Sequence, residues 1–431
     1  MLGRKPAEDP LLNRTASPLT LEPAHGFVVA TGIECSAPVI AGGVRMDELR
    51  KTGHWERYTQ DIEMIAGFGI RFLRYGIPFH VVDHDPTSRD WAWTDAALAA
   101  VRRAGIEPIV DLLHFGVPDD VAGVGDATLP DRFADYAAAF ARRYPWVRYY
   151  TVVNEPLVCA VFSAALGMWN ERASDDRSFV AAIDALSAAT ALGMDAIRQR
   201  RPDAIFIQSD ACESYTASTS RAGELATFLN ERRFVTWELA YGRSPSAPIV
   251  EWLQHSGMTD ARLAWFERAG SDEGCIVGLD YYRGNEWTVL ADGRTRPARR
   301  RLGFAALGRA YHDRLRLPFM LSETNQSGRS TARWLEQVWS DALDLRDEGL
   351  PMRGFCWYGF VDHVDWDSAL TRDDGRVNHC GLVTLDRQLH PWGATYRRLA
   401  LDARLGRYER LGGGSGNAAA SVPRPDGEAA A

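Results

Sequence analysis

Residues 149–156 read YYTVVNEP, and this stretch decides how the rest of the sequence is interpreted. The first five of these residues are aromatic or β-branched, which is typical of a buried strand. Pro156 has no backbone N–H, so strand pairing should end before it. Asn154 and Glu155 are therefore expected at the carboxyl end of the strand, where parallel α/β barrels build their active sites. A solvated glutamate in a turn is the alternative interpretation of so short a motif.

Strand-like and helical patterns alternate on both sides of this stretch. Short apolar, β-rich runs are separated by segments whose apolar residues recur about every 3.6 positions. Gly67, Gly105 and Pro202 stand where helices should end. The expected strands cover residues 27–33, 70–75, 106–114, 149–153, 204–208, 275–282, 319–322 and 355–360. The expected helices cover residues 55–66, 96–103, 133–143, 179–201, 225–241, 260–269, 304–315, 331–346 and 396–405.

This alternation predicts the fold class, a single α/β domain built as a (β/α)8 TIM barrel with long βα loops. A doubly wound sheet is the alternative fold, but no GxGxxG or P-loop follows the first strand. The barrel is expected to cover residues 26–408. Residues 1–25 are polar and contain proline, and residues 409–431 are a Gly/Ala/Pro-rich segment. We expect the first to be a flexible leader and the second a disordered tail.

Composition excludes several classes of function. The chain has 431 residues and a formal net charge of −8, and 46% of its residues are hydrophobic, as in ordinary globular proteins. The densest basic run, RPARRR at 296–301, is interpreted as a solvated loop, so no nucleic-acid partner is expected. No apolar window predicts a membrane span or an export signal, and the six scattered cysteines are expected to be reduced and mostly buried. A cytoplasmic location is therefore expected.

Polar residues gather where the predicted strands end. If the chain is a barrel, these side chains should meet at one face. They are Arg74, His114, Asn154, Glu155, Asp280, Tyr282, Glu323, Asp362, His363 and Asp365. A structural scaffold alone would not need such a set.

Glu155 and Glu323 follow the fourth and seventh predicted strands, so they should face each other across the barrel. Glycoside hydrolases typically use a pair of carboxyl groups, of which one donates a proton and the other attacks the anomeric carbon. Arg74 and Tyr282 are suitable types to keep the attacking carboxylate ionised. Asn154 is placed to bind a sugar hydroxyl. Flat faces for stacking on a pyranose ring are expected from Trp357, Trp366 and Phe115.

Six segments of the chain resemble motifs of family 1 glycoside hydrolases, the β-glucosidase family of retaining (β/α)8 barrel glycosidases, and they occur in the family's order. The segments are GIRFLRYGIPF, GIEPIVDLLHFGVP, TVVNEP, GLDYY, LSETN and GFCWYGFVDHVDW. They resemble GIKxYRFSISW, GIxPxVTLYHWDLP, TxNEP, GLNYY, ITENG and GYFVWSLLDNFEW. The resemblance implies that Glu155 is the acid/base and Glu323 the nucleophile. It also implies that Arg74, His114 and Tyr282 support the site.

The positions that recognise the sugar depart from the family. A gapless alignment from Gly32 places Val39 and Ala41 where the family carries the Gln and Glu of a QxEG run. Asp280 replaces an asparagine. Tyr358, Asp365 and Trp366 occupy the positions of the family's final Trp-Glu-Trp set, and Phe115 also replaces a tryptophan. These residues are expected to bind substrate, with Asp365 on a sugar hydroxyl or, alternatively, capping a loop.

The sequence thus predicts a retaining β-glycoside hydrolase that needs neither cofactor nor metal and has a small carbohydrate as its partner. A transglycosidase, or a hydrolase for a modified sugar in a biosynthetic pathway, is the alternative within the same class. A carbohydrate-binding barrel without turnover is the alternative of another class. The segment HVVDHDP at 80–86 contains two histidines and two aspartates, and it is interpreted as a solvated loop with a capping aspartate. The sugar, the aglycone and the oligomeric state stay open.

Overall fold

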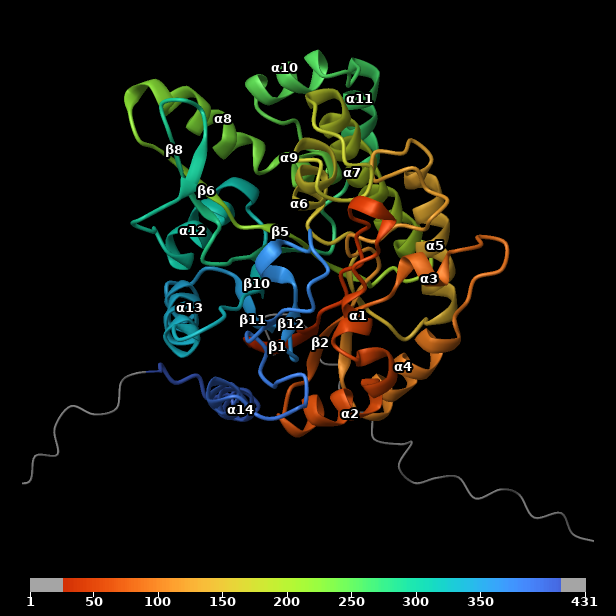
Figure 1. Cartoon of the computed structure of the whole chain (residues 1–431), viewed down its shortest axis with the longest axis vertical. Helices are drawn as coiled ribbons and strands as arrows, with labels where there is room; N and C mark the ends of the chain where they lie inside the picture. The colour runs from red at the N-terminus through yellow and green to blue at the C-terminus, as the bar shows by residue number, and fades with distance from the viewer. Residues whose placement is uncertain (1–25, 412–431) are drawn as a thin grey trace, which may run out of the picture.

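The computed structural model describes residues 26–411, which form a closed barrel of parallel strands (Figure 1). The order around the barrel is β1-β11-β10-β7-β5-β4-β3-β2, and each adjacent pair is parallel. The strands are β1 (Val28–Ile33), β2 (Phe72–Gly76), β3 (Glu107–Asp111), β4 (Tyr149–Thr151), β5 (Ile205–Ala211), β7 (Cys275–Asp280), β10 (Phe319–Glu323) and β11 (Met352–Tyr358). The predicted (β/α)8 barrel is confirmed, and all eight predicted strands are present.

Helices surround the barrel on its outer side (Figure 1). The longer ones are α2 (His54–Gly67), α4 (Ala92–Arg103), α5 (Leu129–Arg143), α7 (Asp176–Arg198), α11 (Asp260–Ala269), α12 (Phe304–Leu315), α13 (Thr331–Asp347) and α14 (Pro391–Ala403). The shorter ones are α1 (Glu48–Lys51), α3 (Phe79–Val82), α6 (Pro156–Ala160), α8 (Gly223–Arg232), α9 (Val235–Ala240) and α10 (Ala247–His255). The helix expected over 225–241 is therefore two helices, because the chain turns at 233–234.

No membrane-spanning segment was expected from the sequence, but helix α7 has the length and apolar composition to cross a membrane. In the barrel it packs against α5, and 72% of its most apolar window is buried. Its apolar surface is thus used in the helical layer around the sheet.

The barrel interior has two layers that follow from strand geometry. Successive side chains of a strand point to opposite faces, so residues two apart share the interior. A lower apolar layer consists of Val28, Ala30, Phe72, Ile109, Tyr149, Ile207, Ile276, Met320 and Cys356. Two residues further along the same strands, the side chains are polar and include Arg74, Asp111, Thr151, Ser209 and Ser322. The apolar layer closes the bottom of the barrel, and the polar layer begins the site.

One glycine is required by close packing in the upper layer. A Cβ atom at Gly32 would lie 2.1 Å from the ring of Tyr358 on the neighbouring strand β11. The absence of a side chain on β1 at this level lets the tyrosine ring enter the barrel.

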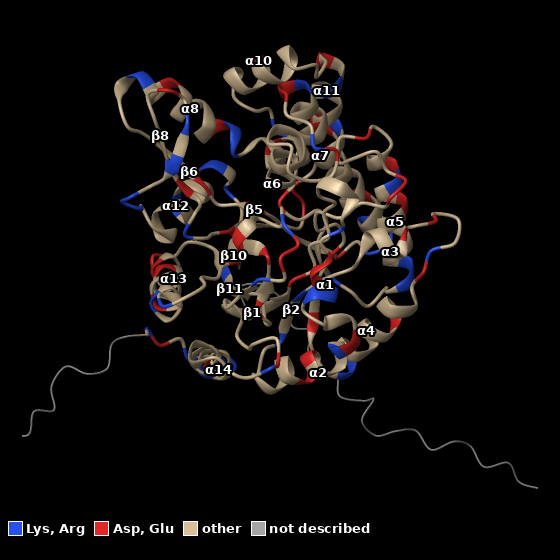
Figure 2. Cartoon of the chain, viewed as in Figure 1, with Lys and Arg blue, Asp and Glu red and all other residues tan. Residues whose placement is uncertain are grey.

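Two small sheets lie in the βα loops and were not predicted. Strands β6 (Ser214–Ala217), β8 (Glu286–Val289) and β9 (Thr295–Pro297) form one, and β12 (His363–Val364) and β13 (Val377–Asn378) form the other. The basic run at 296–301 begins in β9, and Figure 2 colours several Lys and Arg residues blue in this lobe. Its arginines are exposed, as expected for a solvated loop.

Three other expectations have structural outcomes. All six cysteines are buried and unpaired, as predicted. The 80–86 segment contains the predicted capping aspartate, because Asp85 accepts hydrogen bonds from the backbone N–H and the hydroxyl of Thr87, whereas Asp83 is buried and ion-paired with Arg89 and Arg132. The tail was expected to begin at 409, but the backbone carbonyl of Glu409 accepts a hydrogen bond from Trp339, and Arg410 pairs with Asp344 and Asp347 on α13. Residues 1–25 and 412–431, where a leader and tail are predicted, lie outside the described residues.

Candidate active site

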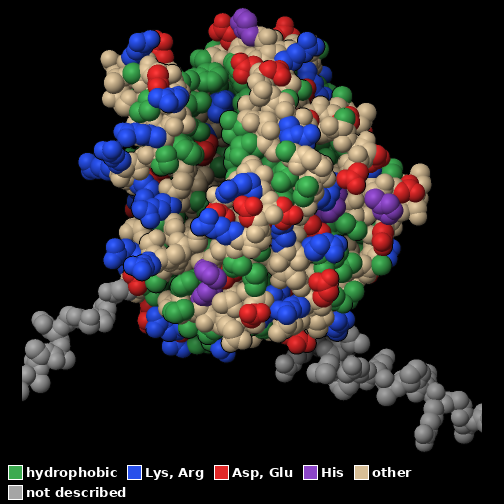
Figure 3. Space-filling model, in the orientation of Figure 1, with side chains coloured by type: hydrophobic (Ala, Val, Ile, Leu, Met, Phe, Trp, Pro, Cys, Tyr) green, Lys and Arg blue, Asp and Glu red, His purple; other side chains and the backbone are tan. Residues whose placement is uncertain are grey.

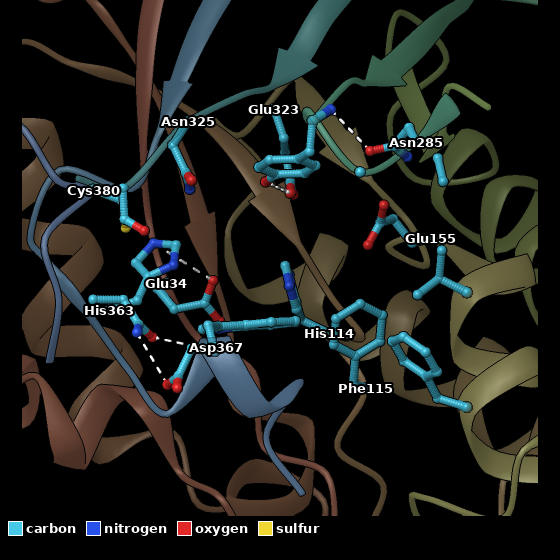
Figure 4. A pocket seen from close by; sticks show the side chains of 18 of the residues that line it. Glu34, His114, Phe115, Glu155, Asn285, Glu323, Asn325, His363, Asp367 and Cys380 are labelled. Carbon is cyan, nitrogen blue, oxygen red and sulfur yellow. Dashed lines mark hydrogen bonds and ion pairs between the residues drawn. The ribbon is translucent and has the colours of Figure 1, made fainter. Parts of the chain in front are cut away.

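A cavity of about 400 Å³ opens at the carboxyl ends of the barrel strands. Figure 3 shows the surface hollowed between the lobe that carries α8 and β8 and the body that carries α6 and α7. Both predicted catalytic glutamates, Glu155 and Glu323, line this cavity, and Figure 4 shows their side chains within it. One carboxylate oxygen of each, together with one of Asp280, lies within 4.8 Å of the others. The structure therefore brings the two residues together from strands far apart in sequence.

Glu155 is placed by the sharp end of its strand. Its backbone adopts the left-handed conformation, with φ 40°, immediately before Pro156 begins helix α6. Its backbone N–H donates to the carbonyl of Ser209 on the neighbouring strand, which fixes this turn. A left-handed conformation in a residue with a side chain is strained, and such strain often occurs at functional sites.

The Glu155 carboxyl group has an environment that favours its neutral form. Within residues 26–411 its carboxyl oxygens make no hydrogen bond or ion pair, and the residue is 8% exposed. Burial raises the pKa of Glu155 well above its ordinary value, and the nearby charges of Asp280, Glu323 and Asp210 raise it further. A carboxyl group that keeps its proton near neutral pH can act as a general acid.

Glu323 has the opposite environment, although it is also buried. Arg74 Nη1 donates to Glu323 Oε1 over 2.5 Å, and the Tyr282 hydroxyl donates to Oε2 over 2.7 Å. Each carboxylate oxygen thus has a donor, and one donor carries a full positive charge. Such contacts stabilise the ionised form of a carboxyl group, which is the form needed for nucleophilic attack.

Arg74 joins the nucleophile position to the polar layer of the barrel. It is 1% exposed, and its Nη2 donates to Asp111 Oδ2 over 3.0 Å and to Asn154 Oδ1 over 2.7 Å. Its planar group can make these contacts at fixed angles because guanidinium donors form a rigid fork. A single buried cation on β2 therefore orients residues from β3, β10 and the segment after β4.

His114 is held from both sides of its ring. Its Nδ1 lies 2.9 Å from Asp111 Oδ2, and its Nε2 lies 3.1 Å from Asn154 Nδ2. Asn154 Oδ1 already accepts from Arg74 and from the Ser209 hydroxyl, so the amide nitrogen must face His114. An amide nitrogen can only donate, so His114 Nε2 accepts, and His114 Nδ1–H donates to Asp111.

Asp280 adds a third carboxyl group, where the family motif carries an asparagine. It is fully buried, and its Oδ1 accepts from the Ser322 hydroxyl over 2.6 Å. Its Oδ2 has no hydrogen-bond partner within the described residues. Burial and the charge of Glu323 raise the pKa of Asp280 well above its ordinary value, against the effect of Arg74. In Figure 2 several acidic residues, in red, lie along the chain near the centre of the barrel.

Glu34 and His363 form a second polar group in the cavity. His363 was expected among the polar residues at the strand ends but without a specific role, and Glu34 was not expected there. Glu34 follows β1 directly, and His363 begins β12. Both line the cavity, and Figure 4 shows them on the side away from Glu155. The gapless alignment had pointed instead to Val39 and Ala41, which are not among the lining residues. The period of two along β1, which places residues 28, 30, 32 and 34 on one face, could have identified Glu34.

The aromatic residues expected to contact sugar divide into two groups. Phe115 and Trp366 line the cavity, as does Tyr282. Trp357 is fully buried, and its indole donates to the carbonyl of Cys380, so it does not offer a stacking face. Tyr358 lies beneath the cavity wall, parallel to the His114 ring at 6.0 Å, and its hydroxyl donates to the Ile33 carbonyl.

Asp365 does not reach the cavity, in contrast to the expected sugar contact. Its Oδ2 accepts from Lys51 over 2.8 Å and from the N–H of Gly375, and its Oδ1 accepts from the N–H of Arg376. The surrounding donors lower the pKa of Asp365 despite its burial. The alternative interpretation, a carboxylate that caps a loop, matches these contacts.

Three groups of side chains have spacings that a metal ion could use. They are Glu155, Asp280 and Glu323; Cys35, Asp111 and His114; and Asp362, His379 and His390. In the last group the Asp362 carboxylate lies 2.8 Å from His379 Nδ1 and 3.0 Å from His390 Nε2. Direct hydrogen bonds thus account for its geometry, and we assign no metal to any of the three.

A (β/α)8 barrel with two buried glutamates at the ends of its fourth and seventh strands has the architecture of a glycoside hydrolase. The model of glycosyl hydrolase family 1 matches residues 49–243, which is 195 of the 431 residues, so this part of the chain is similar to that family. A β-glucosidase from Thermotoga maritima has the same fold, with a TM-score of 0.74 and 17% identity over 88% of this chain and 98% of that one.

Curated relatives are similar only in part. Thermostable β-glucosidase B of Thermobispora bispora is 30% identical over 26% of each chain, and β-glucosidase 4 of Oryza sativa is 27% identical over 26% of each. A 6-phospho-β-galactosidase of Streptococcus equi subsp. zooepidemicus is 24% identical over 59% of this chain and 60% of its own. The match spans about a quarter of the length of the two β-glucosidases.

Proposed function

We propose that the protein is a retaining β-glycoside hydrolase, with Glu155 as acid/base and Glu323 as nucleophile. The observation that carries this proposal is the contrast between two neighbouring glutamates. Glu323 accepts hydrogen bonds from Arg74 and Tyr282, one on each carboxylate oxygen, whereas Glu155 is buried without a hydrogen-bond donor among the described residues. The raised pKa of Glu155 suits a general acid, and the charged donor on Glu323 suits a nucleophile.

The spacing of the two groups supports retention of configuration. Their nearest carboxylate oxygens lie within 4.8 Å. Retaining glycosidases place the carboxyl groups about 5–5.5 Å apart, and inverting enzymes need about 6.5–9.5 Å to admit a water molecule. In the proposed reaction, Glu323 attacks the anomeric carbon while Glu155 protonates the leaving oxygen. Glu155 then removes a proton from the water that releases the sugar from Glu323.

Covalent trapping tests this proposal. Intact mass and peptide mapping after incubation with a panel of 2-deoxy-2-fluoro β-glycosides should show one sugar attached to Glu323. The Glu323→Gln variant should take up no label. Label on another residue, or hydrolysis with inverted anomeric configuration by NMR, would contradict the assignment. The sugar that labels fastest would begin to identify the glycone.

A further inference from the structure

The cavity wall carries acidic side chains and neither lysine nor arginine. The lining residues include five acidic side chains, Glu34, Glu155, Glu213, Glu323 and Asp367, and neither lysine nor arginine is among them. A ligand in this cavity therefore meets an acidic wall. The imidazoles of His114 and His363 also line the cavity, and the cation nearest to the wall is Arg74, which holds Glu323 from beneath it.

Four of the five acidic groups have a partner or an assigned task. Glu323 is held by Arg74 and Tyr282, and Glu155 is the proposed acid. Asp367 pairs with Arg376 over 2.9 Å and accepts a hydrogen bond from Asn378. Glu213 accepts from the Tyr215 hydroxyl and the Trp287 indole. Glu34 is left with one hydrogen-bond donor among the described residues, the N–H of Ser36, and it pairs with neither a lysine nor an arginine there.

Glu34 and His363 face each other across a gap. Glu34 Oε1 accepts from the N–H of Ser36, but Oε2 has His363 Nε2 at 3.9 Å, which is too long for a hydrogen bond. Both residues are 4% exposed, and within residues 26–411 His363 Nε2 has no hydrogen-bond partner. Burial lowers the pKa of His363, so its imidazole is neutral and offers no full charge to Glu34.

A buried carboxylate is costly unless a cation or several donors accompany it. An ammonium group has three donors and a positive charge, so it can bond to Glu34 Oε2 and to another acceptor at the same time. A hydroxyl group has one donor and no charge, so it would not neutralise the negative charge of the acidic wall. A phosphate or carboxylate would add negative charge where no lysine or arginine can meet it.

We propose that the cavity selects a glycone that carries an amino group, with its ammonium bound by Glu34 and His363, and that it rejects phosphorylated and carboxylated glycones. This inference rests on the proposed glycosidase function and names its substrate class. This substrate preference would also distinguish the chain from the 6-phospho-β-galactosidase whose match covers 59% of it.

The test uses matched 4-nitrophenyl β-glucosides. One is unmodified, three carry an amino group in place of the hydroxyl at C3, C4 or C6, one is the 6-phosphate and one the glucuronide. We expect kcat/KM for at least one amino glycoside to exceed that of the glucoside by about tenfold to a hundredfold, as for a charge-assisted hydrogen bond. The 6-phosphate and the glucuronide should not be hydrolysed above background.

The Glu34→Gln variant removes the charge and keeps the shape. It should bring the amino-to-neutral ratio of kcat/KM close to one, while Glu336→Gln, an exposed change on helix α13, should leave the ratio at the wild-type value. A loss of folding alone would lower all rates without changing the ratio. Equal rates on amino and neutral glycosides in the wild type, or an unchanged ratio in Glu34→Gln, would overturn the inference.

A binding measurement separates this inference from the proposed function. If the wild type hydrolyses none of the glycosides, the proposed function fails, and calorimetric titration with free 3-amino, 4-amino and 6-amino deoxyglucose tests recognition alone. Binding that is lost in Glu34→Gln would support the amino-sugar site. Absence of binding, or equal binding by both proteins, would refute it.

Discussion

Glu323 and Glu34 are both buried carboxylates on the wall of one cavity, but they have different surroundings. Glu323 receives hydrogen bonds on both oxygens, one of them from Arg74, whereas Glu34 receives a single backbone N–H and faces an unpartnered imidazole. The first arrangement is complete before any ligand binds. The second leaves room for a donor from outside the protein. The reacting end of the cavity is thus preorganised, and the opposite end is complementary to part of a ligand.

This comparison predicts that changes at the reacting end lower the rate on every substrate, whereas changes at Glu34 alter the ranking of substrates. The largest effect is expected for Glu323→Gln, which removes the proposed nucleophile. Turnover should fall by about 10⁴-fold or more. Initial rates with an aryl glycoside measure this loss, and the unfolding temperature of the variant should stay near that of the wild type. Residual activity above one hundredth would remove Glu323 from the nucleophile role.

Glu155→Gln should have the next largest effect, and the effect should depend on the leaving group. General acid catalysis contributes about 10²–10⁴-fold, so glycosides with poor leaving groups should lose that much. The first step with a 2,4-dinitrophenyl glycoside needs little protonation and should lose less. Pre-steady-state rates with both substrates measure the difference. An equal loss with both would contradict the acid role.

The pH dependence of the wild type should show the raised pKa of Glu155. The acid must be protonated, so kcat/KM should fall as pH rises through that pKa, and Glu155→Gln should lack this alkaline limb. The same sign applies to stability, because a raised folded-state pKa makes folding less favourable as pH rises. The difference in unfolding temperature between Glu155→Gln and wild type should therefore increase with pH. A pH-independent difference would contradict this assignment.

Arg74→Met should lower activity and stability together. It leaves Glu323 and Asp111 buried without their cation, which costs about 3–5 kcal/mol of unfolding free energy. Turnover should fall by about 10²–10³-fold through loss of a preorganised charge contact. Denaturant unfolding and initial rates measure the two effects. Arg74→Lys is the matched control, since it keeps the charge and should recover part of both.

Asp280→Asn should have the smallest effect, because it installs the amide that the family motif carries. We expect turnover to change by only a few-fold, since Ser322 can still donate to the side-chain oxygen. The negative charge of Asp280 is one cause of the raised pKa of Glu155, so its removal should move the alkaline limb to lower pH. The pH profile of kcat/KM measures this shift. An unchanged limb would mean that Asp280 carries no charge at working pH.

The sequence was sufficient for the barrel and for the reacting end. The strands could be recognised because their apolar, β-branched runs are local signals, and their polar ends follow at short distances. Asn154, Glu155 and Glu323 stand directly at such ends. Arg74 and Tyr282 were expected beside the nucleophile, and their contacts with Glu323 are those the structure has.

The opposite end of the cavity could not be derived in the same way. Trp357 and Asp365 were expected on the sugar, but a backbone carbonyl holds the first in the core and Lys51 holds the second in a loop. The partners of such residues come from distant parts of the chain, so no local pattern indicates them. Glu34 was overlooked because a gapless alignment continued beyond the strand into a loop of different length.

The sequence by itself therefore determined the fold and placed the pair of glutamates, because strand periodicity and short motifs depend on neighbouring residues. The tertiary structure alone decided which carboxyl groups have donors and which do not. That distinction depends on contacts such as Arg74 with Glu323 and His363 opposite Glu34, which join segments hundreds of residues apart. The charge balance inside the cavity is a property of those contacts, and the proposed preference for an amino sugar rests on it.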